Sequence, residues 1–283
     1  MSSLHSSGRT DRGIARIDNH LKESYFIENI LTYDKEFNED NKFNLTLVQA
    51  VDENKVASTS TVGRGFPNES LGYDGITNAI GSVSVEREKS TIRTASFMGR
   101  ARYNLFDKYL FTATYRADGS SVNAKDFKWT YNPAAAFAWK LQNEEFLQDV
   151  DAIQELKLRL SYGSLANALK RPYASLFTAN GEPYIFDDGI TASGYSPSVI
   201  LPNQNLKHEK ITTFNVGLDF SVFNRVLTGS VEYYKASTKD LLLRRPVPSI
   251  TGYQYTYFNA GELENSGLEI SLSANLIKTE DLK

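Results

Sequence analysis

The chain has 283 residues, of which 41% are hydrophobic and 12% aromatic, and its formal net charge is −3. It contains no cysteine, which excludes disulfides and thiolate chemistry, and its acidic balance argues against a nucleic-acid partner. No run approaches about 18 consecutive apolar residues, so a transmembrane helix is not expected. Residues 1–23 form a polar lead that we expect to be a loop.

Strand-like alternation recurs along the rest of the chain, and the links between these segments differ in length. Short links at 38–42, 106–107 and 223–225 alternate with long links at 58–90, 119–129, 164–209 and 241–262, and a link of intermediate length lies at 141–155. Tight turns at one end and long loops at the other are typical of an outer-membrane β-barrel, with periplasmic turns and extracellular loops. The expected strands are 24–37, 43–57, 91–105, 108–118, 130–140, 156–163, 210–222, 226–240 and 263–277.

Each expected strand has one apolar and one polar face. The last strand alternates Leu268, Ile270 and Leu272 with polar residues, because successive strand side chains point to opposite faces. A sandwich would bury the apolar face between two sheets, whereas a large barrel would turn it toward lipid. Several segments reach about 11–15 residues and a tilted membrane strand needs about 9–11, which favours the barrel. Bacterial single-chain barrels have even strand numbers, so an odd count of strands predicts an open, curved antiparallel segment of a larger barrel.

Catalytic, metal-binding and cofactor-binding patterns are weak in this sequence. None of the three histidines lies near another at metal-ligand spacing. Asp187 and Asp188 could ligate Ca²⁺, although a solvated turn explains them more simply. Glu144 and Glu145 are expected to be N-terminal charges of a short helical turn rather than an acid–base pair. We therefore predict no catalytic residues, no metal or cofactor, and no enzyme.

The long links are rich in aromatic residues surrounded by Gly, Pro, Ser and Asn. Exposed aromatic side chains with polar neighbours often contact ligands or partners, but large loops also use such rings as their own small cores. Both interpretations stay open. The candidate contact residues are Tyr173, Tyr184, Phe186, Tyr195, Tyr253, Tyr255 and Tyr257.

A series of motifs in fixed order resembles one family, the TonB-dependent outer-membrane nutrient importers of the starch-utilisation (SusC/RagA) type. The order and spacing of these motifs resemble those of the family from about Tyr25 to Lys283, and as a set they are highly specific. They include DKYLFTAT (Asp107–Thr114), RADGSS (Arg116–Ser121), LKLRLSYG (Leu156–Gly163), TKDLL (Thr238–Leu242) and NAGELENSGLE (Asn259–Glu269).

This resemblance implies that residues 24–283 are part of a TonB-dependent receptor β-barrel, without the plug domain and the final strands. The whole protein would be a plugged barrel of about 22 strands that imports oligosaccharides or peptides across the outer membrane. Its implied partners are outer-membrane lipid, a SusD-like surface lipoprotein, and the TonB-ExbB-ExbD system acting through a missing N-terminal part. The alternative is a soluble or cell-surface β-sandwich that binds glycans without transport.

Overall fold

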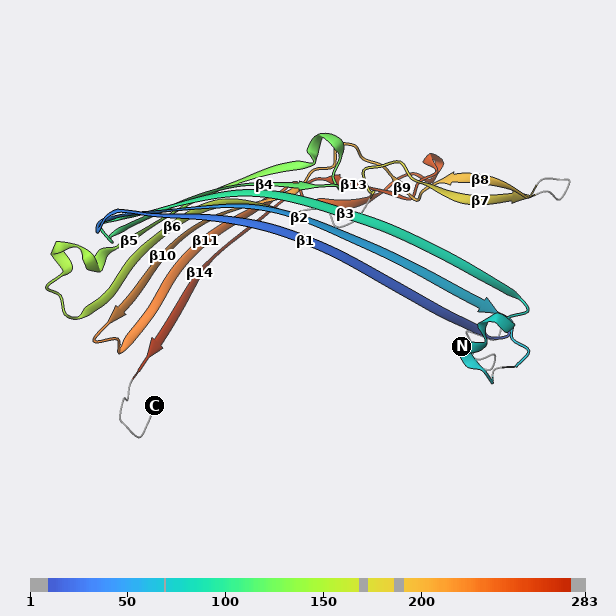
Figure 1. The fold of residues 1–283 in the computed structure, drawn as a ribbon, viewed down its shortest axis with the longest axis horizontal. Helices are drawn as coiled ribbons and strands as arrows, with labels where there is room; N and C mark the ends of the chain where they lie inside the picture. The colour runs from blue at the N-terminus through green and yellow to red at the C-terminus, as the bar shows by residue number, and fades with distance from the viewer. Residues whose placement is uncertain (1–9, 69, 168–172, 186–190, 276–283) are drawn as a thin grey trace. The chain divides into compact units, whose positions relative to one another are not determined.

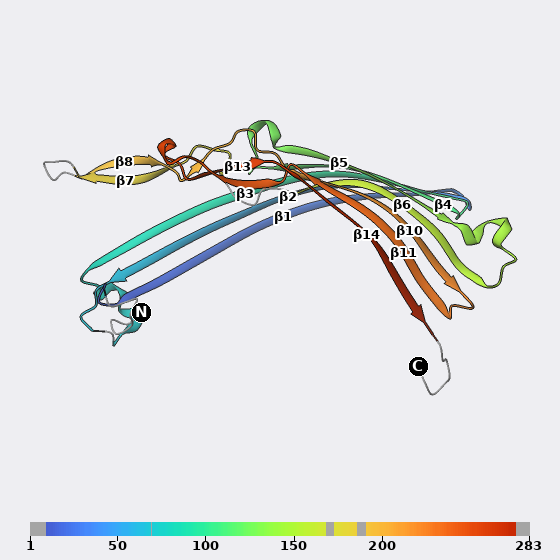
Figure 2. The same cartoon turned by 180° about the vertical axis from the view of Figure 1, so that it is seen from behind.

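The computed structural model describes residues 10–68, 70–167, 173–185 and 191–275. Its main feature is one sheet of nine strands, which lie in the order β1-β2-β3-β4-β5-β6-β10-β11-β14 (Figures 1 and 2). This confirms the antiparallel sheet with nine strands, and the other sheets of the described residues have only three and two strands. The strands are β1 (Ile14–Asn38), β2 (Asn41–Arg64), β3 (Ser82–Leu105), β4 (Tyr109–Ser120), β5 (Trp129–Lys140), β6 (Ile153–Asn167), β10 (Glu209–Val222), β11 (Leu227–Lys239) and β14 (Glu262–Ala274).

The chain divides into two compact units, and the first comprises residues 1–26 and 52–93. Here the structure corrects the sequence analysis, because β1 begins at Ile14 and not after a loop that ends at residue 23. The link expected at 58–90 shortens to 65–81, which contains the 3-10 helix η1 (Gly72–Asn78). These strand ends are rich in polar residues, and apolar alternation runs there only over short stretches, such as Val83 and Val85, each of which follows a serine. Backbone pairing does not need that alternation.

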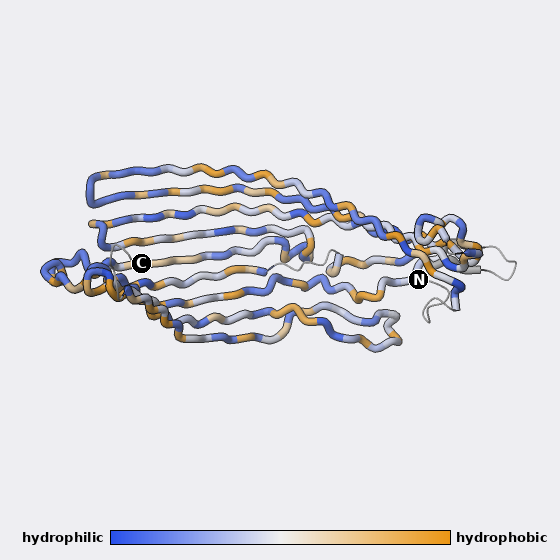
Figure 3. Tube along the Cα trace, turned by 90° about the horizontal axis from the view of Figure 1, so that it is seen from below, coloured by the Kyte–Doolittle hydropathy of each residue, from blue (hydrophilic) through white to orange (hydrophobic). Residues whose placement is uncertain are grey.

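The second unit comprises residues 27–51 and 94–283, and it holds a wall with two distinct faces. Strand register places apolar side chains opposite one another from β4 to β14. One such row is Phe111, Phe137, Leu160, Val216, Tyr233 and Leu268. The adjacent row on the other face is Thr112, Ala136, Ser161, Asn215, Tyr234 and Gly267. We call these the apolar face and the polar face, and the alternation can be followed along the strands in Figure 3.

Two of the expected tight turns are confirmed at one end of this wall. Phe106 and Asp107 have positive φ angles of 56° and 48°, and Asn224 has a φ of 55°. Left-handed residues of this kind let a chain reverse within two or three residues. The 141–155 link lies at the same end, where the Phe223 N–H donates to the Ala152 carbonyl at 2.8 Å. This link contains η3 (Leu141–Asn143) and η4 (Glu145–Leu147), as the expected helical turn required.

The long links of the second unit contain short elements that the sequence analysis did not predict. β7 (Ala179–Ile185) and β8 (Thr191–Pro197) form a two-stranded sheet. β9 (Ile200–Leu201), β12 (Leu242–Pro246) and β13 (Tyr255–Asn259) form a three-stranded sheet. The 3-10 helices η2 (Lys125–Phe127) and η5 (Ser249–Thr251) complete these links. Among the described residues, no helix has the length and apolar character needed to cross a membrane.

Candidate functional site

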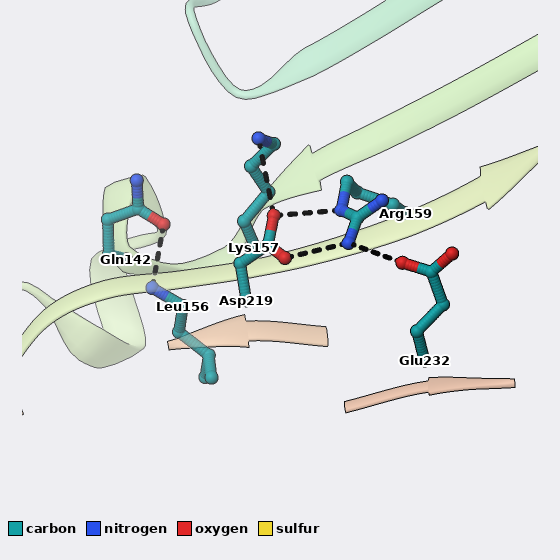
Figure 4. A network of polar contacts seen from close by, with 6 residues as sticks. All are labelled: Gln142, Leu156, Lys157, Arg159, Asp219 and Glu232. Carbon is teal, nitrogen blue, oxygen red and sulfur yellow. Dashed lines mark hydrogen bonds and ion pairs between the residues drawn. The ribbon is translucent and has the colours of Figure 1, made fainter. Parts of the chain in front are cut away.

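An ion network on β6, β10 and β11 is the main cluster of charges on the polar face (Figure 4). Arg159 donates from Nε and Nη2 to the two carboxylate oxygens of Asp219, each at 2.8 Å. The same Nη2 lies 3.2 Å from Glu232 Oε2. Lys157 Nζ adds an ion pair to Asp219 at 3.5 Å. Two cations thus balance two carboxylates, and the network has no excess charge.

Gly217 makes the bond between Arg159 and Glu232 possible. The register places Gly217 directly between these two residues, on the middle strand of the three. A Cβ atom at position 217 would lie only 2.9 Å from Arg159 Nη2, so any side chain there would obstruct the guanidinium. Charged groups facing lipid are costly, whereas here they are paired on the face opposite the apolar rows. The network therefore identifies the polar face as the side away from lipid.

Glu144 forms a second cluster at the tight-turn end of the wall. Its carboxylate accepts hydrogen bonds from the Tyr109 hydroxyl at 2.7 Å and the Trp139 Nε1–H at 2.9 Å. Lys108 Nζ donates to its other oxygen at 3.0 Å. These hydrogen bonds, that from Tyr109 foremost, lower the pKa of Glu144 to about 2. Glu144 and Glu145 lie at the N-terminus of η4, as expected, but the Glu144 side chain makes no capping bond there and ties β4 to β5 instead.

The long links at the opposite end of the second unit pack into a compact group, which we call the loop cluster (residues 121–128, 173–178, 198–208 and 240–259). Its apolar centre contains Val122, Ala124, Ala174 and Leu206, all of which are buried. Polar contacts then join separate links. The Ser175 hydroxyl donates to the Val122 carbonyl at 3.3 Å.

Asn259 and His208 add further contacts inside the loop cluster. The Asn259 amide donates to the Lys207 carbonyl at 3.1 Å and to the Asp240 carbonyl at 2.8 Å. His208 is buried against the Asn123 amide, and this burial lowers the pKa of the imidazole. The loop cluster is thus held by specific bonds as well as by apolar packing.

Four of the candidate aromatic residues lie in the loop cluster, and three of them, Tyr253, Tyr255 and Tyr257, contribute to its interior. Tyr255 is only 6% exposed and packs edge-on against Tyr257, with ring centroids 5.7 Å apart. The Arg244 guanidinium lies over the Tyr255 ring, 3.6 Å from its centroid. Tyr253 and Tyr257 are partly buried. The alternative that such rings form the loops' own core therefore holds for Tyr255, which is not available to a ligand.

The other candidates are dispersed or lie outside the described residues. Tyr195 on β8 is 80% exposed, and Tyr173 is exposed at the edge of the loop cluster, where residues 173–178 begin. Tyr184 belongs to β7, but its side chain is not described, and Phe186 lies outside the described residues, as do the acidic residues at 187 and 188. Ile250 was not a candidate, although it is 95% exposed. The sequence feature that could have indicated its exposure is its position in the turn-forming stretch Pro248–Gly252.

A metal centre is not apparent in the part of the chain that the structure describes. No group of three His, Asp or Glu side chains there is placed to hold an ion. The carboxylates that do cluster, such as Asp219 and Glu232, are already bonded to cationic or amide side chains.

Comparison with known proteins then identifies the class. Residues 4–280 match the family model described as "TonB dependent receptor-like, beta-barrel". The chain belongs to this family, and it forms part of the wall of an outer-membrane β-barrel.

Similarity to individual relatives is more informative than the match to the family model. The chain is 38% identical over 228 residues to the TonB-dependent receptor SusC of Bacteroides thetaiotaomicron, covering 77% of the chain and 22% of SusC. It is 32% identical over 262 residues to the TonB-dependent receptor P3 of Formosa agariphila, covering 90% of the chain and 25% of that receptor. The chain thus spans about a quarter of the length of these relatives.

A solved structure shares the fold of this wall. The structure of the RagAB peptide transporter superimposes with a TM-score of 0.84 and 23% sequence identity, covering 94% of this chain and 29% of the other. Together these findings confirm the resemblance to the SusC/RagA type.

Proposed function

We propose that the protein carrying this barrel segment imports nutrients, either oligosaccharides or peptides, across the outer membrane. The observation that carries the proposal is the 38% identity to SusC along a wall with one apolar and one polar face. The apolar face would contact lipid, and the polar face would line the interior through which a solute passes. Such a protein acts as a receptor and carrier and not as an enzyme.

The energy for import would come from the TonB-ExbB-ExbD system, and we propose a SusD-like surface lipoprotein as the partner that delivers the solute. The identity to SusC, whose name describes a TonB-dependent receptor, supports the first part of this proposal. The loop cluster is the part of this chain that would face the cell exterior, because long loops of such barrels are extracellular. Ile250 in the loop cluster and Tyr195 on β8 are suited to contact a partner or solute, since exposed apolar side chains often mark interaction surfaces.

Deletion of the gene in its own host tests this function. Uptake of labelled oligosaccharides and peptides should fall in the deletion strain for at least one class of solute, and the same uptake should fall when TonB is deleted. Re-expression of the gene should restore it. Unchanged uptake of every solute tested after either deletion would contradict TonB-dependent import. Affinity purification from the outer membrane should also recover a surface lipoprotein, and recovery of the barrel alone would contradict the partnership.

A further inference from the structure

Arg100 and Arg102 on the polar face lack the carboxylate partners that the arginines of the neighbouring strands have among the described residues. Arg116 donates from Nε to Asp118 at 2.7 Å, and Arg159 is bonded to Asp219 and Glu232. Arg100 and Arg102, both on β3, have no carboxylate partner among the described residues. They lie two positions apart on the same face of one strand, which separates their Cα atoms by about 7 Å.

These arginines border a hollow on the polar face. The hollow has a volume of about 680 Å³. Its polar lining residues include Arg100, Arg102, Thr112, Thr114, Ser161 and Thr213, and larger apolar residues such as Leu110, Leu165 and Ile211 line the rest. The register explains this composition. Arg102 lies opposite Thr112, and Arg100 lies opposite Thr114.

Small residues on β5 and β6 form the floor of the hollow. Thr114 is followed across the sheet by Ala134 and Gly163, and then by Thr213 on β10. A Cβ atom at position 163 would lie 2.9 Å from the Ala134 Cβ, so this part of the wall accepts no larger side chain without rearrangement. The space in front of the two arginines is therefore kept open by the sequence of the wall itself.

The polar groups of the lining favour one kind of ligand group, and the apolar residues beside them suit the carbon skeleton that carries it. A guanidinium offers five N–H donors in a planar arrangement that matches two oxygens of a carboxylate or sulfate. Threonine and serine hydroxyls can donate further hydrogen bonds to the same oxygens. No aspartate or glutamate lines the hollow, so its charge is positive. We propose that Arg100 and Arg102 form a binding site for an oxyanion, carboxylate or sulfate, carried by a solute on the polar side of the wall.

The role of this site in transport rests on the proposed function, whereas oxyanion binding itself does not. Import would then extend to acidic solutes, such as oligosaccharides or peptides that carry carboxylate or sulfate groups. The closing experiment measures binding directly, so that failure of this site and failure of TonB-dependent import give different results.

The test is calorimetric titration of the purified full-length protein in detergent micelles with sodium sulfate, and separately with sodium acetate, at constant ionic strength. Arg100→Gln and Arg102→Gln each remove one guanidinium. Arg225→Gln is the matched control, because it removes the same charge from an exposed turn. We expect saturable binding of at least one anion, weakened by about tenfold or more in each of the first two variants. The control variant should bind like the unaltered protein.

Three results would overturn the proposal. The first is the absence of saturable anion binding, and the second is equal anion affinity in all variants. The third is a loss of anion affinity in Arg225→Gln as large as that in Arg100→Gln and Arg102→Gln. A thermal melt of each variant adds one further outcome. Absent anion binding together with a lower Tm for Arg100→Gln would indicate that a carboxylate of the protein itself occupies the hollow, which also overturns it. Loss of uptake on TonB deletion, by contrast, bears only on import.

Discussion

A cation placed at Leu218 provides a direct test of which face of the wall contacts lipid. Leu218 lies on the apolar face of β10, opposite Leu158 on β6 and Val231 on β11. The comparison variant is Ser271→Arg on β14. Ser271 lies opposite Ser230, which in turn lies opposite Asp219 on the polar face. Both variants introduce the same charge into a strand, so the difference between them reports the environment of each face.

The expected cost of Leu218→Arg follows from its depth in the membrane. Leu218 lies four residues before Val222, the last residue of β10. Four residues span about 13 Å along a strand, which corresponds to about 9–10 Å of depth at a tilt of 40–45°. Half of the hydrocarbon core is about 15 Å thick. The position is therefore between the interface and the midplane, and we expect a loss of about 2–3 kcal/mol from the free energy of unfolding.

Urea titration of the protein in lipid vesicles measures this loss, and the amount of protein in the outer membrane provides a second readout. Ser271→Arg should cost less than about 1 kcal/mol, because an arginine there remains on the side away from lipid. Equal costs at the two positions, or a larger cost at Ser271, would refute the assignment of the two faces.

The remaining predictions concern the ends of the strands, the ion network and the isolated chain. A cysteine at Ile250 should react with an impermeant maleimide on intact cells and one at Asn224 should not; the reverse pattern would contradict the orientation. Glu144→Gln should lower the Tm at neutral pH. The unaltered protein should lose the same stabilisation as the pH falls from about 4.5 to about 2, because the pKa of Glu144 is lower in the folded than in the unfolded protein. The same dependence of Tm on pH in the variant and the unaltered protein would refute this. Gly217→Leu should lower the Tm by displacing the guanidinium that crosses this position, whereas a melt like that of the unaltered protein would show that the crossing is dispensable. Residues 1–283 expressed alone should aggregate in water, since β1 and β14 expose unpaired backbone edges; a sharp melt from a soluble monomer would contradict this.

The wall could be predicted from the sequence because its two signals are local. Alternation such as Leu156, Leu158 and Leu160 on β6 reflects a period of two, which every membrane strand must keep. The tight turns at 106–107 and 223–225 were visible as interruptions between two such strands. The ends of β1, β2 and β3 were missed for the same reason. Apolar residues are few in these strand ends, as between Val85 and Ser90, so the hydrophobic period there is too short to identify a strand.

The contacts between separate links could not be predicted in the same way. Asn259 bonds to the carbonyls of Lys207 and Asp240, and no pattern in the sequence relates these positions. The loop aromatics illustrate the same limit. Tyr255 and Tyr195 have similar polar surroundings in the sequence, yet one is buried and the other is 80% exposed. Their difference depends on which link packs beside each ring, which is a property of the tertiary structure.

The polar face shows how charge placement along a barrel wall separates structural groups from groups available to a solute. Arg159 lies beside Gly217, which lets its guanidinium reach two carboxylates on neighbouring strands, so its charge is used within the wall. Arg100 and Arg102 lie opposite threonines instead, and no carboxylate of the described residues pairs with either guanidinium. Both sets have the same alternating pattern in the sequence, and only the residues opposite them in the register differ. The register between strands therefore determines which arginines stabilise the wall and which can bind an anion.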